Sequence, residues 1–233
     1  MTKFQTALSF DDVLLVPKMS HIPSRKDIDL TSRIRDTFYK LPIISSPMDT
    51  VTESAMATCM DKLGGLGIIH RYNSIEEQVK IIQESVSLGS SNVGAAIGVS
   101  GDFEERATAL CDAGAKVICL DIAHGHHEMM GRAISRLRNI LPSSVSIVAG
   151  NVATLEGFDF LADAGADAVR VGVGGGSICS TRIQTGHGVP TLQSILDCSM
   201  SDRDAVIIAD GGIKNSGDAT KALAAGADFV MLG

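Results

Sequence analysis

The 233-residue sequence contains no tryptophan, few other aromatic residues and no long apolar run. Aromatic residues make up only 4% of the chain, so the core must be built from Ala, Val, Ile, Leu and Gly. Such a composition is typical of buried parallel strands packed against helices. No segment approaches the roughly 20 apolar residues that a membrane-spanning helix needs, and no apolar signal core follows Met1. We therefore expect a cytoplasmic protein that has no membrane partner.

Positive charge is also scarce, and the cysteines are few and irregularly spaced. The formal net charge of −7 disfavours nucleic acid as the main partner, because phosphate backbones bind basic faces. An odd number of cysteines without CxxC spacing, in a chain that has no export signal, predicts free thiols rather than disulfides. Four of the five lie in helix or strand patterns, where we expect buried structural thiols: Cys59, Cys111, Cys119 and Cys198.

One internal repeat indicates the architecture. The tripeptide Ala-Gly-Ala stands at residues 113–115, 164–166 and 225–227, each time after a helix-like stretch and before an apolar run. Glycine is suited to the left-handed turn that ends a helix. The spacings of 164 − 113 = 51 and 225 − 164 = 61 residues each have room for two strand–helix units of a barrel. Simple richness in Ala and Gly is the alternative explanation.

Short β-branched runs predict eight strands, over residues 41–45, 67–70, 93–98, 117–121, 146–149, 168–172, 205–209 and 229–232. Helical patterns lie between them, over residues 75–87, 103–113, 127–141, 154–164 and 216–225. Eight parallel strands with right-handed crossovers close most naturally into a (β/α)₈ TIM barrel. An open doubly wound sheet is the alternative, but the first strand–helix turn lacks GxGxxG. We expect one domain over residues 1–233, with the loop and helix that follow the eighth strand beyond Gly233.

The loop after the strand at 168–172 carries the sharpest functional signal, because TIM barrels build their active sites from such loops. Three successive glycines, residues 174–176, let backbone N–H groups approach an anion closely. Ser177 adds a hydroxyl suited to a phosphate oxygen. Cys179 follows at the loop tip, where a thiolate could act as a nucleophile. A flexible loop with an incidental cysteine is the alternative.

Two further loops carry candidate binding groups. Asp210-Gly211-Gly212 follows the strand at 205–209, where many barrels place a phosphate site. Its alternative interpretation is a hairpin turn, which would not suit a strand–helix junction. The histidines 124, 126 and 127 suggest a metal site, but zinc needs three or four ligands in a tetrahedral arrangement. We prefer a polar loop that flanks Asp121.

Seven segments together resemble the motifs of the IMP dehydrogenase/GMP reductase family. They occur in the family's order over nearly the whole chain, at residues 8–15, 46–50, 121–126, 150–152, 176–182, 186–190 and 210–213. By this resemblance Cys179 would attack C2 of a purine nucleotide, with Thr181 beside it. In IMP dehydrogenase, hydride then passes to NAD and water hydrolyses the thioimidate to XMP, toward GMP biosynthesis. In GMP reductase, GMP loses ammonia and NADPH supplies the hydride that gives IMP.

The resemblance also implies a set of binding residues. Those for the nucleotide would be Ser46, Met48, Asn151, Arg170, Ser177, Asp210, Gly211, Gly212 and Gly233. Those for the nicotinamide cofactor would be Asp121, Ala123 and His124. A potassium ion would be held by the backbone carbonyls of Gly174, Gly176 and Cys179. Family members are usually homotetramers, and we expect the same assembly here.

The sequence departs from the family's pattern at three positions. Gly175 stands where proline is common, Ser180 where threonine is usual, and Thr191 where glutamine usually follows the proline. We expect these changes to loosen the loop without removing its nucleophile.

Local motifs and domain content favour different members of the family. The paired CBS domains of most IMP dehydrogenases are absent, because residues 87–92 lead almost directly to the strand at 93–98; this resembles GMP reductase. Residues 45–53 and 188–190 look more like the dehydrogenase. Because inserted domains are lost more easily than active-site segments are rewritten, we predict an NAD-dependent IMP dehydrogenase. GMP reductase is the alternative, followed by a non-catalytic nucleotide-binding barrel and by another phosphate-binding barrel enzyme.

The dehydrogenase's water-activating pair and the reductase's glutamate are expected beyond Gly233.

Overall fold

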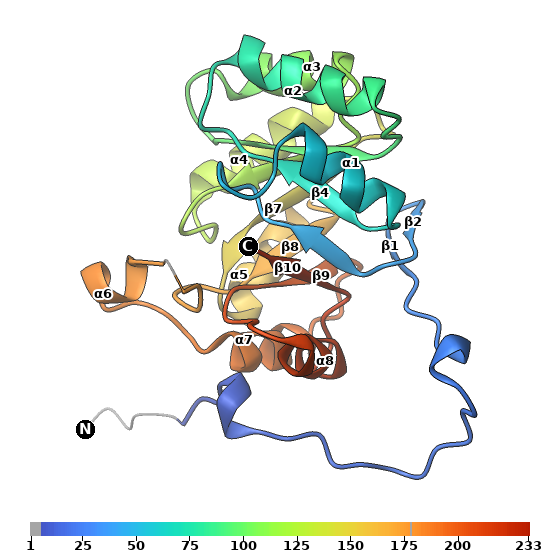
Figure 1. The fold of residues 1–233 in the computed structure, drawn as a ribbon. Coiled ribbons are helices and arrows are strands. Elements are labelled where there is room, and N and C mark those ends of the chain that lie inside the picture. Colours follow the sequence, from blue (N-terminus) through green and yellow to red (C-terminus); the bar gives the residue numbers. More distant parts are fainter. Residues whose placement is uncertain (1–5, 178) are drawn as a thin grey trace.

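Eight short parallel strands close into a barrel in the computed structural model, which describes residues 6–177 and 179–233 (Figure 1). The strands are β3 Ile43–Ser45, β4 Leu66–Ile69, β5 Val93–Ile97, β6 Val117–Asp121, β7 Ser146–Val152, β8 Ala168–Val171, β9 Val206–Asp210 and β10 Phe229–Leu232. Neighbours along the chain pair in parallel, and β10 pairs with β3 to close the ring. Each predicted strand overlaps an observed one, and the predicted TIM barrel is confirmed.

Helices cover the outside of the barrel (Figure 1). They are α1 Ser54–Lys62, α2 Ile75–Ser87, α3 Phe103–Asp112, α4 Glu128–Ile140, α5 Leu155–Asp163, α7 Thr191–Cys198 and α8 Ser216–Ala224. A short helix, α6 Thr181–Thr185, projects away from the barrel in the loop after β8. The five predicted helices are present, whereas α1, α6 and α7 were not among the predicted ranges. Side-chain caps start several of them: Ser74 accepts from the Glu77 amide, and Thr154 accepts from the Gly157 amide. These caps fix where each helix begins after its loop.

The Ala-Gly-Ala repeat marks the ends of three helices. Gly114, Gly165 and Gly226 have φ angles of 118°, 107° and 115°, in the region that favours glycine. Each glycine therefore reverses the chain from a helix toward the next strand, as the repeat predicts.

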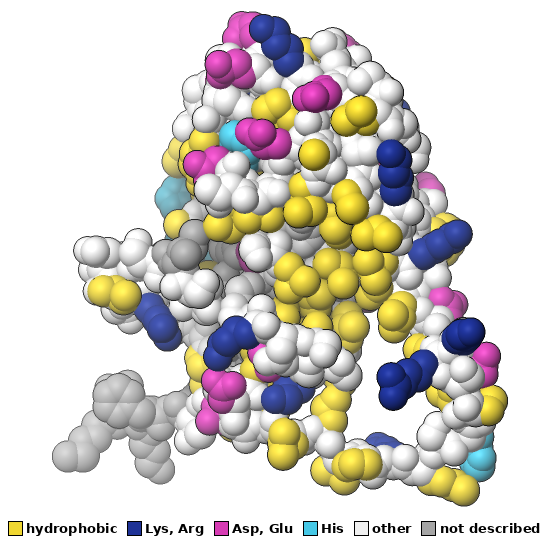
Figure 2. Space-filling model, viewed as in Figure 1, with side chains coloured by type: hydrophobic (Ala, Val, Ile, Leu, Met, Phe, Trp, Pro, Cys, Tyr) yellow, Lys and Arg dark blue, Asp and Glu magenta, His cyan; other side chains and the backbone are white. Residues whose placement is uncertain are grey.

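A hairpin that the sequence did not reveal seals the amino end of the barrel. Its strands are β1 Ser32–Ile34 and β2 Thr37–Tyr39, paired antiparallel. Ile34 and Tyr39 are buried in a cluster that includes Phe229, the first residue of β10. The rings of Tyr39 and Phe229 meet edge to face with centroids 5.4 Å apart, a favourable aromatic geometry. Ahead of the hairpin, the chain carries two short 3₁₀ turns, Phe10–Asp12 and Arg25–Asp27, joined by an extended segment that stands away from the barrel (Figure 1 and Figure 2).

The thiols outside the glycine loop differ in burial. Cys119 and Cys198 are fully buried, and burial raises the pKa of each to about 12. Cys111 is half-buried, and burial raises its pKa to about 11. The expectation of a buried thiol was wrong for Cys59, which is exposed because it lies on the outer side of α1. All five thiols are free. Within residues 6–177 and 179–233, no helix is both long enough and apolar enough to span a membrane.

Gly67 of β4 sets how closely α1 approaches the barrel. A Cβ at this position would lie 2.5 Å from the Cα and 2.9 Å from the Cβ of Ala57 in α1. Because the obstacle is helix backbone, Gly67→Ala should lower the free energy of unfolding by roughly 1–3 kcal/mol, measured by urea titration followed by circular dichroism. Gly98→Ala is the matched control, since its nearest neighbour would be a side-chain atom 4.0 Å away. Equal stability of the two variants would contradict this packing.

Candidate active site

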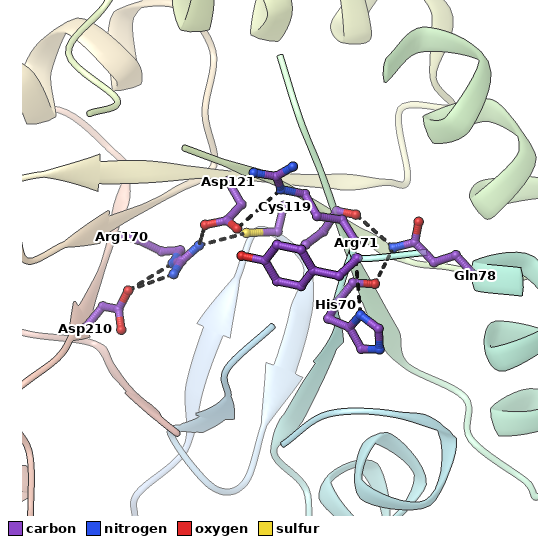
Figure 3. A network of polar contacts seen from close by, with 9 residues as sticks. His70, Arg71, Gln78, Cys119, Asp121, Arg170 and Asp210 are labelled. Carbon is purple, nitrogen blue, oxygen red and sulfur yellow. Dashed lines mark hydrogen bonds and ion pairs between the residues drawn. The ribbon is translucent and has the colours of Figure 1, made fainter. Parts of the chain in front are cut away.

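The carboxyl end of the barrel is organised around the buried guanidinium of Arg170 in β8 (Figure 3). Its Nη1 lies 2.5 Å from Oδ1 of Asp121, at the end of β6. Its Nη2 and Nε lie 2.8 and 3.2 Å from Oδ2 of Asp210, at the end of β9. The Cys119 sulfur lies 3.7 Å from Nη1. One cation thus holds two carboxylates that come from strands on different sides of it.

Asn151 of β7 extends this network. Its Nδ2 donates to Oδ2 of Asp210 at 2.7 Å and to the Gly172 carbonyl at 2.8 Å. Four successive strands, β6 to β9, therefore each contribute at least one member to a connected polar cluster. Burial alone would lower the pKa of Arg170, but Asp210, Cys119 and Asp121 together raise it well above its usual value. The guanidinium is therefore a permanent charge in the floor of the site.

The loop after β4 reaches the same network from the other side, and no role was assigned to it from the sequence. Arg71 lies with Nε 3.6 Å from Oδ2 of Asp121, and its guanidinium lies 5.5 Å from the centre of the Tyr72 ring. Gln78 of α2 is buried and donates to the carbonyls of His70 and Ala96 at 2.9 and 2.8 Å. Figure 3 shows Arg71 between Asp121 on one side and Gln78 on the other. The polar run at 70–73 after a predicted strand was the available signal for these residues.

Cys179 lies half-buried in the loop after β8. The Thr181 hydroxyl has the largest effect on the thiol and lowers its pKa, while burial acts in the opposite direction. The backbone N–H groups of Thr181 and Gly174, together with the positive charge of Arg182, also lower this pKa. The result favours the thiolate, which is the nucleophilic form. Ile178 belongs to the same family-like segment but lies outside the described residues.

The glycines of this loop permit close contact with the loop after β9. A Cβ at Gly211 would lie 3.0 Å from the Gly176 amide nitrogen, and one at Gly175 would lie 2.2 Å from Oγ1 of Thr191. Gly175 and Thr191, two of the departures from the family's pattern, therefore contact one another. A cavity of about 600 Å³ opens beside the two loops, and its wall includes Ser177 and Gly212.

A third group of candidate residues lies where β10 meets β3. The Ser46 amide donates to the Leu232 carbonyl at 2.8 Å, and a Cβ at Gly233 would lie 3.0 Å from the Met48 sulfur and 3.8 Å from the Ser46 hydroxyl. Ser46, Met48 and Gly233 are thus neighbours, although they come from opposite ends of the sequence.

Ala123 and His124 are exposed in the loop after β6. The ring of His124 lies 6.3 Å from that of His126. Within the described part of the chain, no group of three His, Cys, Asp or Glu residues could hold a metal ion. The Gly176 carbonyl, one of three assigned to potassium by resemblance, accepts a hydrogen bond from the Cys179 amide at 3.2 Å.

Comparison with known proteins identifies the family. A sequence model of the IMP dehydrogenase / GMP reductase domain matches residues 7–233. The chain belongs to this family. The resemblance inferred from the motifs is therefore confirmed, as is its coarser implication of an oxidoreductase of purine nucleotides that uses a nicotinamide cofactor.

Relatives of both kinds resemble the chain over almost its full length. The inosine-5'-monophosphate dehydrogenase of Nitrosopumilus maritimus is 36% identical over 99% of this chain and 75% of the relative. The GMP reductase of Ascaris suum is 37% identical over 99% of this chain and 68% of the relative. Among solved structures, a GMP reductase variant from Trypanosoma brucei superposes with a TM-score of 0.94 at 30% identity, covering 99% of this chain and 81% of the other. The inosine 5'-monophosphate dehydrogenase of Legionella pneumophila superposes with a TM-score of 0.90 at 49% identity, covering 98% of this chain and 69% of the other.

Removal of the Arg170 charge tests the network. Arg170→Met leaves Asp121 and Asp210 facing one another without their shared cation, so the free energy of unfolding should fall by about 3 kcal/mol or more. Arg170→Lys keeps a charge, but one ammonium cannot hold both carboxylates. Its free energy of unfolding should therefore lie between that of the parent protein and that of Arg170→Met. Denaturant titration measures both; a Met variant as stable as the parent would show that the carboxylates do not depend on this arginine.

The surroundings of Cys179 predict a shift in its reactivity. Thr181→Ala removes the largest influence that lowers the pKa of this thiol, so the midpoint of its alkylation–pH profile should move upward and its rate at neutral pH should fall. Site-resolved mass spectrometry after iodoacetamide pulses separates Cys179 from the exposed Cys59. Ser180→Ala is the control, because the Ser180 side chain makes no capping hydrogen bond. An unmoved midpoint in Thr181→Ala would count against the assignment.

Proposed function

We propose that the chain is the catalytic domain of an NAD-dependent IMP dehydrogenase, which oxidises IMP to XMP through a covalent intermediate at Cys179. The observation that carries the proposal is the Cys179 thiol, whose pKa is lowered by Thr181, in a glycine-rich loop at the carboxyl end of the barrel. A thiolate there is a competent nucleophile toward an electron-poor purine carbon. The 49% identity to the Legionella dehydrogenase supports this choice.

The nucleotide would lie across the three groups of residues described above. The three nitrogen donors to Asp210, one from Asn151 and two from Arg170, all bind its Oδ2, so its Oδ1 is available for ribose hydroxyls. Ser177, Gly211 and Gly212 would bind the phosphate through a hydroxyl and backbone N–H groups. Arg170 would act by holding Asp210 in place and by adding positive charge beneath the sugar. The remaining nucleotide contacts would come from Ser46, Met48, Asn151 and Gly233.

The cofactor would lie beside Asp121, Ala123 and His124. The Asp121 carboxylate is held by Arg170 and Arg71 and remains partly exposed, so its free lone pairs suit the hydroxyl or amide donors of a dinucleotide. When bound, NAD supplies the acceptor for the hydride that leaves C2. The Cys179 thiolate would bond to C2, and water would later hydrolyse the thioimidate, releasing XMP and restoring the thiolate. A potassium ion would fit the carbonyls of Gly174, Gly176 and Cys179, since a carbonyl that accepts one hydrogen bond keeps a second lone pair.

GMP reductase is the second candidate, in which GMP and NADPH give IMP and ammonia. The TM-score of 0.94 with the Trypanosoma enzyme favours it, as does the absence of a CBS insertion from the sequence. A non-catalytic nucleotide-binding barrel is a third. In each case we propose a single domain over residues 1–233, acting in the cytoplasm as a homotetramer.

The reactions are separated by following the reduced-nicotinamide absorbance band. A rise with IMP and NAD that disappears in Cys179→Ala establishes the dehydrogenase; a Cys179-dependent fall with GMP and NADPH establishes the reductase instead. Cys59→Ser is the matched control, because it alters an exposed thiol in α1 and should leave the rate unchanged. Nucleotide binding without either signal would reject both enzymes in favour of the silent barrel.

A further inference from the structure

A second cavity, of about 510 Å³, lies at the amino end of the barrel. Its wall is formed by β2, by the end of α1 and by the segments that precede β4, β5, β6 and β7. Figure 1 shows the β1–β2 hairpin and the α6 loop on opposite sides of the barrel. The cavity is therefore separate from the candidate active site.

The charge of this cavity is opposite to that of the whole chain. Lys40, Lys62 and Lys116 line it from three separate segments, and within the described part of the chain none of them forms an ion pair. The one acidic residue in the wall is Asp61, whose Oδ2 already accepts from the amide and hydroxyl of Ser91 at 2.8 and 3.2 Å. Three positive charges against one negative, in a protein of net charge −7, favour the local binding of an anion.

Tyr39, in the same wall, has an unsatisfied polar group. Its residue is 2% exposed, and its hydroxyl has no hydrogen-bond partner among residues 6–177 and 179–233. Burial raises the pKa of Tyr39 to about 12; Asn92 acts in the opposite direction, but its amide does not complete a hydrogen bond with the hydroxyl. A buried hydroxyl without a partner is uncommon and costs free energy. At neutral pH it remains protonated and able to donate.

We propose that this amino-end cavity binds a phosphate group. The three lysines would neutralise the charge, and neutral donors in the wall, such as the Ser144 hydroxyl, the Asn92 amide and the Tyr39 hydroxyl, would complete its hydrogen bonds. Oxyanions accept charge-assisted hydrogen bonds from ammonium groups. The proposal is independent of the reaction at Cys179, because the two sites lie at opposite ends of the barrel.

The protein carries a built-in probe of this site. It has no tryptophan and only two tyrosines, Tyr39 in the cavity and Tyr72 at the other end of the barrel. In a Tyr72→Phe background, Tyr39 is the sole tyrosine fluorophore. Titration with inorganic phosphate should then give a saturable change in tyrosine fluorescence, while sodium chloride at matched ionic strength should not. Ribose 5-phosphate in a parallel titration distinguishes a phosphate monoester from the free anion, and saturation by either supports the site.

Lysine variants determine whether the signal comes from the cavity. Lys62→Ala and Lys116→Ala should each weaken phosphate binding by about tenfold, whereas Lys80→Ala on the exposed side of α2 should leave it unchanged. Calorimetry of Tyr39→Phe tests the hydroxyl without the fluorophore and should show weaker binding. A response that chloride reproduces, or a Lys62→Ala/Lys116→Ala double variant that binds like the parent, would overturn the proposal. Cys179→Ala should still bind phosphate here, which keeps this result separate from that of the oxidoreductase assay.

Discussion

The sharing of one buried guanidinium between two carboxylates is the constraint on which the candidate site depends. Arg170 contacts Asp121 of β6 and Asp210 of β9. Asn151 of β7 also donates a hydrogen bond to Asp210. Two carboxylates at one end of a barrel would repel each other without a cation between them. Because the residues proposed to contact cofactor and ribose are fixed by one group, their relative position follows from the barrel rather than from mobile loops.

The second constraint on the site is that glycines, which have no side chain, stand where two of its loops meet. The loops after β8 and β9 meet where Gly175, Gly176 and Gly211 approach Thr191 and one another. The two departures at Gly175 and Thr191 are spatially one change, since a Cβ at the first would collide with the hydroxyl of the second. These residues are 191 − 175 = 16 positions apart in the sequence, which alone does not show that they contact one another.

Much of the fold could be predicted because its signals are local. β-branched runs indicated every barrel strand, and the Ala-Gly-Ala turns have the left-handed glycines that the repeat implied. The β1–β2 hairpin was missed because its strands have only three residues each and its turn uses Arg35 at φ 52°, not glycine. In the site, the family resemblance placed Thr181 beside Cys179, but the effect of its hydroxyl on the pKa of the thiol is visible only in the structure. The contact of Arg71 with Asp121 joins residues 50 positions apart, and only the closed barrel brings them together.

The edge-to-face contact of Tyr39 with Phe229 has a consequence for the order of folding. These residues are 229 − 39 = 190 positions apart, and β3 and β10, which close the ring, are separated by a similar stretch. Contacts of such long range form slowly, because a large loop must close before they contribute. The hairpin is made early during synthesis but gains its partner only when the last strand arrives. Tyr39, in the wall of the amino-end cavity, therefore gains its packing against Phe229 only when the barrel has closed.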